Sequence, residues 1–154
     1  MKACWGFSLD FIPHISGGSV RWHRSDKTAM LDIIIDNKNL MQASFYSGVP
    51  RLEEDLQGLL PQAVALANGT WRRGATYHGM LDIIRDIRDT HSNCFGYYNY
   101  TQLPLAYAFL SAKTGDLLTA EAELDQYVIR NRLDDDEVAK LKKLARDCAE
   151  LTIK

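Results

Sequence analysis

The sequence predicts a single α+β domain over residues 1–154, with an antiparallel sheet at the N-terminus packed against helices. Residues 3–48 alternate apolar and polar side chains with a period of two, which is typical of strands that bury one face. Beyond Pro50 the apolar residues recur at helical spacing, so residues 51–154 are expected to form a layer of about five helices. A chain of 154 residues can bury a substantial core as one domain.

Four consecutive strands are expected to pair as an antiparallel meander. In the first strand, large apolar residues from Trp5 to Phe11 alternate with small or polar ones, and Pro13 limits pairing beyond it. Gly17-Gly18 supplies a hairpin turn that tolerates positive φ. Turn signals divide the segment into strands at residues 5–11, 20–24, 28–36 and 40–46.

In that register, the face opposite the apolar one collects polar side chains. An antiparallel sheet ordinarily exposes one such face to solvent, and a partner-binding surface is the alternative. A loop rich in Asn, Gly and Tyr after residue 90 offers a second candidate binding rim, or else packs onto the core. The candidate contact residues are Asp10, His14, Arg21, His23, Asp32 and Tyr46 on the sheet face, with Tyr97 and Tyr98 in the loop.

The helical layer is expected to begin at Arg51. Pro61 should kink or divide the first helix, because proline cannot donate a hydrogen bond to the preceding turn, and Asn68-Gly69 should end it. A second amphipathic helix is expected over residues 77–87.

Capping signals mark the helices of the last third. Gly115 fits the left-handed position that ends a helix, and Asp116 can cap the next one. Residues 105–129 resemble one helical hairpin of the tetratricopeptide type, although a solenoid needs about three repeats or more. Asp134 and Glu137 have the spacing of a capping box ahead of a final amphipathic helix.

Charge and cysteine content exclude several classes of partner. The net charge of −2 provides no global positive field that would attract nucleic acid. The three cysteines, Cys4, Cys94 and Cys148, are far apart, which fits reduced thiols better than a disulfide framework or a thiolate metal site. The N-terminus lacks the apolar region of a signal peptide, and no segment reaches the roughly 20 apolar residues of a membrane span. We therefore expect a cytoplasmic protein that binds neither nucleic acid nor membrane.

The sequence contains none of the motifs that identify a catalytic or ligand-binding site, such as a G-x-S-x-G elbow, a P-loop, H-E-x-x-H or an EF-hand. No catalytic residue, cofactor or metal is therefore expected. One catalytic alternative remains, in which His14 and His23 meet across the hairpin beside Asp10 or Asp32 as the acid–base pair of a small hydrolase or RNase. The two histidines and Asp10 could also ligate a metal, but no spacing rule selects them.

The segment F-S-L-D-F-I-P-H-I-S-G-G-x-V-R-W-H-R-S-D-K-T-A, followed by a strand and then by helices, resembles small bacterial immunity proteins of polymorphic toxin systems. These systems include contact-dependent inhibition and type VI or Rhs effector loci. The resemblance covers the order of elements over most of the chain, and its specific part is residues 11–27.

This resemblance implies an antitoxin that neutralises one cognate toxin domain by direct, stoichiometric binding and by occlusion of its active site or substrate surface. A net charge of −2 is not strongly acidic, which argues against a basic nuclease as the toxin. Besides the hydrolase, the other alternative is an adaptor that binds a peptide through the helical hairpin of residues 105–129.

Overall fold

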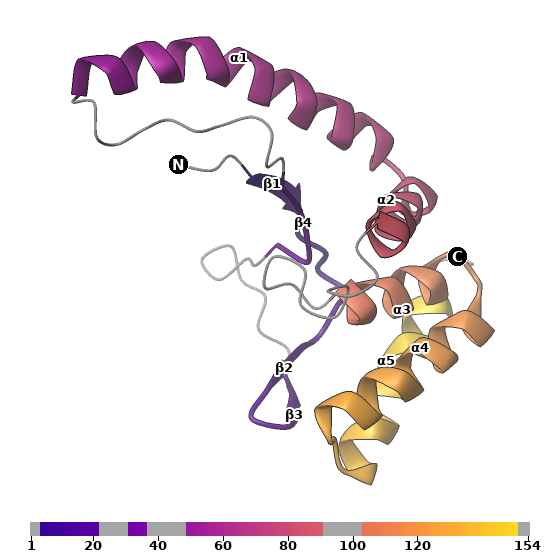
Figure 1. The fold of residues 1–154 in the computed structure, drawn as a ribbon. Helices are drawn as coiled ribbons and strands as arrows, with labels where there is room; N and C mark the ends of the chain where they lie inside the picture. The colour runs from indigo at the N-terminus through magenta and orange to yellow at the C-terminus, as the bar shows by residue number, and fades with distance from the viewer. Residues whose placement is uncertain (1–3, 22–30, 37–48, 91–102, 151–154) are drawn as a thin grey trace.

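The computed structural model describes residues 4–21, 31–36, 49–90 and 103–150. Within these ranges the five helices and short antiparallel strands confirm the α+β class (Figure 1). The elements are β1 (Cys4–Phe7), β2 (His14–Ser16), β3 (Ser19–Arg21), β4 (Ile33–Asp36), α1 (Val49–Arg73), α2 (Tyr77–Thr90), α3 (Leu103–Lys113), α4 (Leu117–Asn131) and α5 (Asp135–Glu150).

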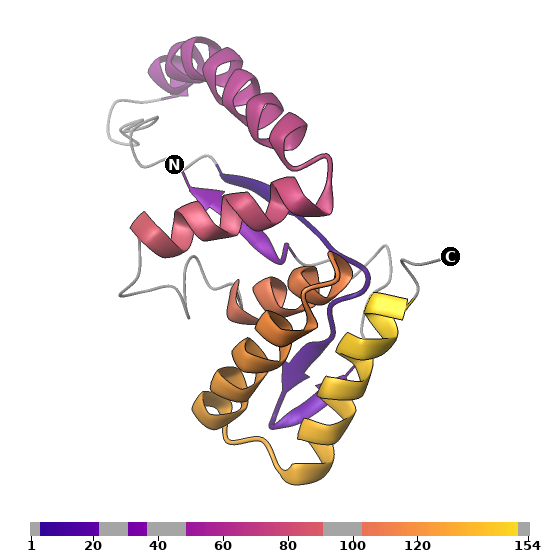
Figure 2. The same cartoon turned by 90° about the vertical axis from the view of Figure 1, so that its right-hand side faces the viewer.

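Helix α3 lies at the centre of the core. Every residue from Leu103 to Ala112 is buried, and helices α2, α4 and α5 all contact α3. A helix that is apolar on all sides is stable only when other elements cover it. The strand segments add Ile12, Val20 and Ile33 to the same buried cluster, and Figure 2 shows the β2–β3 hairpin beside α5.

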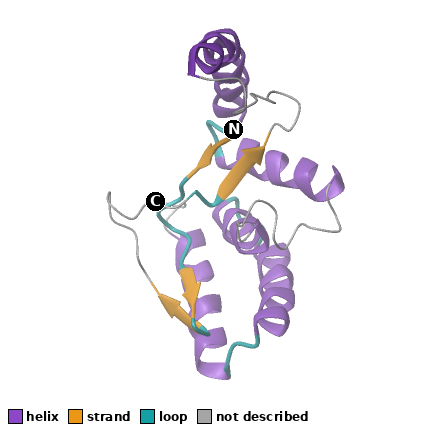
Figure 3. Ribbon diagram, turned by 60° about the vertical axis from the view of Figure 1, so that its left-hand side comes forward, coloured by secondary structure: helices purple, strands orange, loops and turns teal. Residues whose placement is uncertain are grey.

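The predicted four-stranded meander is wrong for the described strands. They form two separate antiparallel sheets of two strands, in which β1 pairs with β4 and β2 pairs with β3 (Figure 3). The first strand ends at Phe7 rather than at residue 11, because the chain turns there. In that turn the Ile12 N–H donates to the Leu9 carbonyl oxygen at 3.2 Å.

Gly17 and Gly18 form the predicted hairpin turn, with φ values of 59° and 78°. The strands that this turn joins are β2 and β3, and not the first strand and its predicted neighbour. The remainder of the predicted second strand, the start of the third and the whole of the fourth lie outside the described residues.

The β1–β4 pair depends on a residue without a side chain. A Cβ atom at Gly6 would lie 1.9 Å from the Ile33 carbonyl oxygen, so only glycine permits this approach of the two backbones. The same strand holds the end of α1. Trp5 Nε1 donates to Thr70 Oγ1 at 3.0 Å, and Trp71 Nε1 donates to the Gly6 carbonyl oxygen at 3.4 Å.

Helix α1 runs without interruption from Val49 to Arg73, so Pro61 does not divide the helix and the predicted stop at Asn68-Gly69 is wrong. Pro61 is exposed, and the backbone carbonyl that it leaves without a helical partner can be hydrated there. The helix ends before Gly74, which is buried against Phe7: a Cβ at Gly74 would lie 2.2 Å from Phe7 Cζ. None of the described helices is both long enough and apolar enough to cross a membrane.

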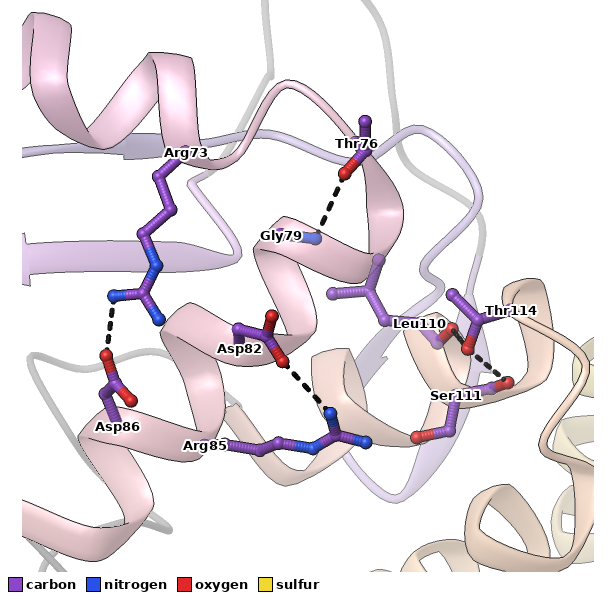
Figure 4. A network of polar contacts seen from close by, with 9 residues as sticks. All are labelled: Arg73, Thr76, Gly79, Asp82, Arg85, Asp86, Leu110, Ser111 and Thr114. Atoms are coloured by element: carbon purple, nitrogen blue, oxygen red, sulfur yellow. Dashed lines mark hydrogen bonds and ion pairs between the residues drawn. The ribbon is translucent and has the colours of Figure 1, made fainter.

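Polar contacts fix the corner between α1 and α2 (Figure 4). Arg73 at the end of α1 forms an ion pair with Asp86 of α2, with a distance of 2.5 Å between Nη1 and Oδ2. Thr76 Oγ1 accepts the Gly79 N–H at 3.1 Å and so satisfies one of the free amide groups at the start of α2.

The predicted glycine stop after α3 and the predicted N-cap of α4 are confirmed. Gly115 has a φ of 90°, and Asp116 Oδ1 accepts the Thr119 N–H at 3.0 Å. Hydrogen bonds from the Thr119 side chain and backbone hold the pKa of the Asp116 carboxyl below its usual value. At the start of α5, Asp134 Oδ1 accepts the Glu137 N–H at 2.9 Å, as the capping-box spacing predicts.

The carboxylate of Glu137 binds the backbone of the β2–β3 hairpin. Its Oε2 atom accepts the Val20 N–H at 2.6 Å, and Lys140 Nζ donates to the Val20 carbonyl oxygen at 2.5 Å. The two side chains also lie 3.6 Å apart as an ion pair. Because the outer edge of a strand leaves backbone groups without partners, this pair covers the edge of β3 and ties the hairpin to α5.

We predict that Gly6→Ala destabilises the protein by roughly 1–3 kcal/mol, because the added methyl group must displace one of two paired strands. Urea unfolding followed by circular dichroism measures the change. Gly58→Ala in α1 is the matched control, since a Cβ there meets nothing within 4 Å and alanine is the better helix former. Equal stability of the two variants would contradict the close approach at Gly6.

We also predict that Glu137→Ala lowers the free energy of unfolding by about 1–3 kcal/mol, because the Val20 N–H loses its charged acceptor. Asp136→Ala is the control: Asp136 is exposed and lies in the same first turn of α5, so both variants lose one favourable charge at the helix N-terminus. If both variants are equally stable, the bond to Val20 contributes nothing.

Candidate functional site

The structure separates the predicted contact residues. Asp10, His14, Arg21 and Asp32 lie within the described ranges, whereas His23, Tyr46, Tyr97 and Tyr98 lie outside them. Because the described strands form two sheets, the single polar face on which these residues were expected to meet is absent from the described part of the chain.

His14 and Arg21 are brought together. They are paired residues of β2 and β3, His14 partly buried and Arg21 exposed. Cross-strand partners of this kind lie on one face of a hairpin. The hairpin end of the molecule therefore presents an imidazole and a guanidinium side by side.

Asp32 has a structural role in a different place. Its Oδ2 atom accepts the Leu9 N–H at 2.7 Å, and its own backbone N–H donates to the Phe7 carbonyl oxygen at 2.8 Å. The carboxylate thereby stabilises the turn in which the first strand ends. The described residues contain no group of three or more His, Cys, Asp or Glu side chains that could hold a metal ion.

Asp10 lines a groove with two lobes, which we call the Lys113 groove. The larger lobe has a volume of about 710 Å³ and the smaller one about 410 Å³, and both are lined by Tyr77 and Lys113. The other described residues of the larger lobe are Ala75, Thr76, His78, Met80, Thr114, Gly115, Leu117 and Ala149. Those of the smaller lobe are Asp10, Phe11, Leu144, Asp147 and Cys148.

The ammonium group of Lys113 lies where the two lobes meet. Its Nζ atom is 5.6 Å from the centre of the Phe11 ring and 5.8 Å from that of Tyr77, and the two rings form an edge-to-face pair. It also donates to the Cys148 carbonyl oxygen at 3.4 Å. Cation–π attraction and one backbone acceptor thus hold a partly buried charge in the groove.

The Cys148 thiol on the wall of the smaller lobe is a poor nucleophile. Burial raises its pKa, the nearby Lys113 charge lowers it to a lesser extent, and Asp10 raises it further. Since the thiolate is the reactive form of cysteine, this side chain is a wall of the groove rather than a catalytic group.

A second candidate surface is a row of exposed apolar side chains on α1, the α1 stripe, formed by Leu60, Val64 and Trp71. Their relative exposures are 62%, 47% and 46%. Spacings of four and seven residues place them on one side of the helix, next to the buried Ala67. The apolar side of α1 is therefore wider than the part that the rest of the protein covers.

Sequence patterns did not reveal either surface. Phe11 was expected on a strand and Tyr77 in a helical stripe, and Lys113 precedes the Gly115 helix stop without any distinctive spacing. The described lining of the groove comes from four separate stretches of the sequence, so no local motif could reveal it. The α1 stripe has a partial signal, because Leu60 and Val64 show helical spacing, but spacing does not tell a buried position from an exposed one.

Comparison of the chain with protein-family models, with curated proteins and with solved structures gives no match. The function is therefore inferred from the residues and surfaces of this chain.

We predict that iodoacetamide alkylates Cys148 much more slowly than the exposed Cys4 near neutral pH, because burial and a raised pKa both reduce the available thiolate. Mass spectrometry of timed samples measures both rates. Lys113→Met should slow Cys148 further, since it removes the charge that lowers the thiol pKa, whereas Lys143→Met on the exposed side of α5 should not. A Cys148 that reacts as fast as Cys4 would contradict this environment.

Proposed function

We propose that this chain is a bacterial immunity protein, which neutralises a cognate toxin domain in the cytoplasm by forming a stoichiometric complex with it. The observation that carries the proposal is the α1 stripe, with Leu60, Val64 and Trp71 each about half exposed. Contiguous exposed apolar residues on a folded protein are typical of surfaces that bind another protein. The resemblance of residues 11–27 to immunity proteins supplies the class of partner.

The position of the stripe suits this role. The last turn of α1 is anchored to β1 through Trp5 and Trp71, while the rest of the helix extends away from the helices around α3 (Figure 1). A partner can therefore reach the side of α1 that carries Leu60 and Val64. A helix presented in this way binds by placing its apolar residues in a groove of the partner, and the occluded groove accounts for inhibition.

The polar candidates form a second proposed contact region at the hairpin end of the protein. His14 and Arg21 are its described members, and His23 is the next polar residue of the sequence pattern. Such exposed polar contacts tune the rate of encounter and the choice of partner more than the affinity. Asp10 and Asp32, which lie away from the hairpin, and Tyr46, Tyr97 and Tyr98, which lie outside the described residues, stay proposed contacts from the sequence alone.

An adaptor function is the second candidate. On α4, Leu118 is 85% exposed and Ile129 is 73% exposed, so the proposed tetratricopeptide-like hairpin of α3 and α4 offers its own apolar surface. In that case the ligand would be a peptide, and changes on α4 would abolish binding.

The first experiment is co-expression with the reading frame immediately upstream, with growth and affinity purification as readouts. We expect that the neighbour alone stops growth, and that this protein restores growth and co-purifies with it at one-to-one stoichiometry. A harmless neighbour that does not bind would overturn the proposal and make an assay of the His14 and His23 region for hydrolase activity the next step.

A variant pair tests the surface. Leu60→Asp combined with Val64→Asp should weaken binding at least about tenfold, because two charges replace apolar anchors in the contact. Leu118→Asp is the matched control, an exposed leucine on α4 that should leave binding unchanged. The opposite result, with binding lost only in Leu118→Asp, would favour the adaptor. Isothermal calorimetry gives the dissociation constants.

A further inference from the structure

We propose that the larger lobe of the Lys113 groove binds a small organic carboxylate, a molecule with one carboxylate group on an aromatic or aliphatic body. This site is separate from the α1 stripe. It takes a small molecule and not a protein.

The charge at the junction of the lobes favours an anion. Lys113 lies within ion-pair distance of no carboxylate among the described residues, and its ammonium donates there to a backbone carbonyl oxygen at 3.4 Å. An ammonium has three donors, so donors remain for a ligand. Hydrogen bonds between charged groups are the strong ones, particularly where solvent is partly excluded.

The walls of the larger lobe favour an apolar body. Its volume of about 710 Å³ lies in the range of small-molecule sites, and Tyr77, Met80 and Leu117 are the large apolar side chains of its described lining. The hydroxyl of Thr114 already donates within α3, at 3.0 Å to the carbonyl oxygens of Leu110 and Ser111. The Thr114 hydroxyl proton is therefore already used within the protein, and Lys113 is the charged residue that lines both lobes.

The distribution of acidic residues selects between the lobes. The smaller lobe carries Asp10 and Asp147, which repel an anion. The ionisable groups among the described residues of the larger lobe are Tyr77, His78 and Lys113, none of them acidic at neutral pH. A carboxylate that contacts Lys113 therefore places its body in the larger lobe, against Met80.

Nuclear magnetic resonance of the intact protein with ¹³C-labelled methionine methyl groups tests this site. The Met80 signal is assigned through Met80→Leu, and the probe is 3-phenylpropionate. We expect a saturable shift of the Met80 signal, and no such shift with the neutral 3-phenylpropanamide. Equal binding of the amide, or no saturable shift with the carboxylate, would overturn the proposal. An equal response to inorganic phosphate would also overturn it, because phosphate has no apolar body.

Variants locate the contact. Lys113→Gln should weaken the carboxylate about tenfold or more, while Lys113→Arg should retain binding. If Lys113→Gln does not fold, Leu117→Glu decides the question, because it adds a negative charge at a partly exposed position on the wall of the lobe. Leu118→Glu is its matched control, an equal change of charge one residue away and outside the described lining. Equal affinity in these two variants would place the carboxylate elsewhere.

Discussion

The continuous burial of α3 from Leu103 to Ala112 requires the rest of the chain to surround this helix. Helices α2, α4 and α5 all pack against it. The hairpin and the turn after β1 then add Val20 and Ile12 to the same cluster. Even the Ser111 hydroxyl is enclosed without a hydrogen-bond partner among the described residues. The free energy of burying the apolar side chains must exceed the desolvation free energy of this hydroxyl. The candidate groove lies at the C-terminal end of α3, where residues of α2, α4 and α5 line it together with Lys113.

The features that the sequence predicts correctly are local. Gly17-Gly18, Gly115, Asp116 and Asp134 act within a few residues of themselves, so spacing and residue type were sufficient to identify their roles. The strand pairing depends on contacts between distant residues, and a period of two does not say which strand is the partner. The turn that ends β1 is stabilised by Asp32, a residue 23 positions away from Leu9. No rule that considers neighbouring residues could predict that bond.

Pro61 and Lys113 show that the sequence also does not predict whether a side chain is exposed or packed. An interior proline removes one helical hydrogen bond, and α1 continues through Pro61 at an exposed position where water can reach the free carbonyl. Lys113 resembles a favourable charge at a helix C-terminus, and only the packing of Phe11 and Tyr77 makes it the charged centre of a groove. Both outcomes depend on what surrounds the residue in space.

The two proposed contact regions lie at opposite ends of the molecule, with α1 at one end and the β2–β3 hairpin at the other (Figures 1 and 3). A partner that binds the α1 stripe therefore leaves the hairpin free, unless it extends along the whole length of the protein. The Lys113 groove lies between them, beside the C-terminal end of α3. Three surfaces of different chemistry, one apolar, one polar and one cationic, are thus spatially separate.

The bonds between Val20 and α5 join residues that are 117 and 120 positions apart in the sequence. On the ribosome, the hairpin is therefore made well before its charged partners. The two side chains on α5 can cover the edge of β3 only after α5 has left the exit tunnel. A truncation before Glu137 would release a chain whose N-terminal hairpin has lost its support, and such a fragment is a natural target for proteolysis.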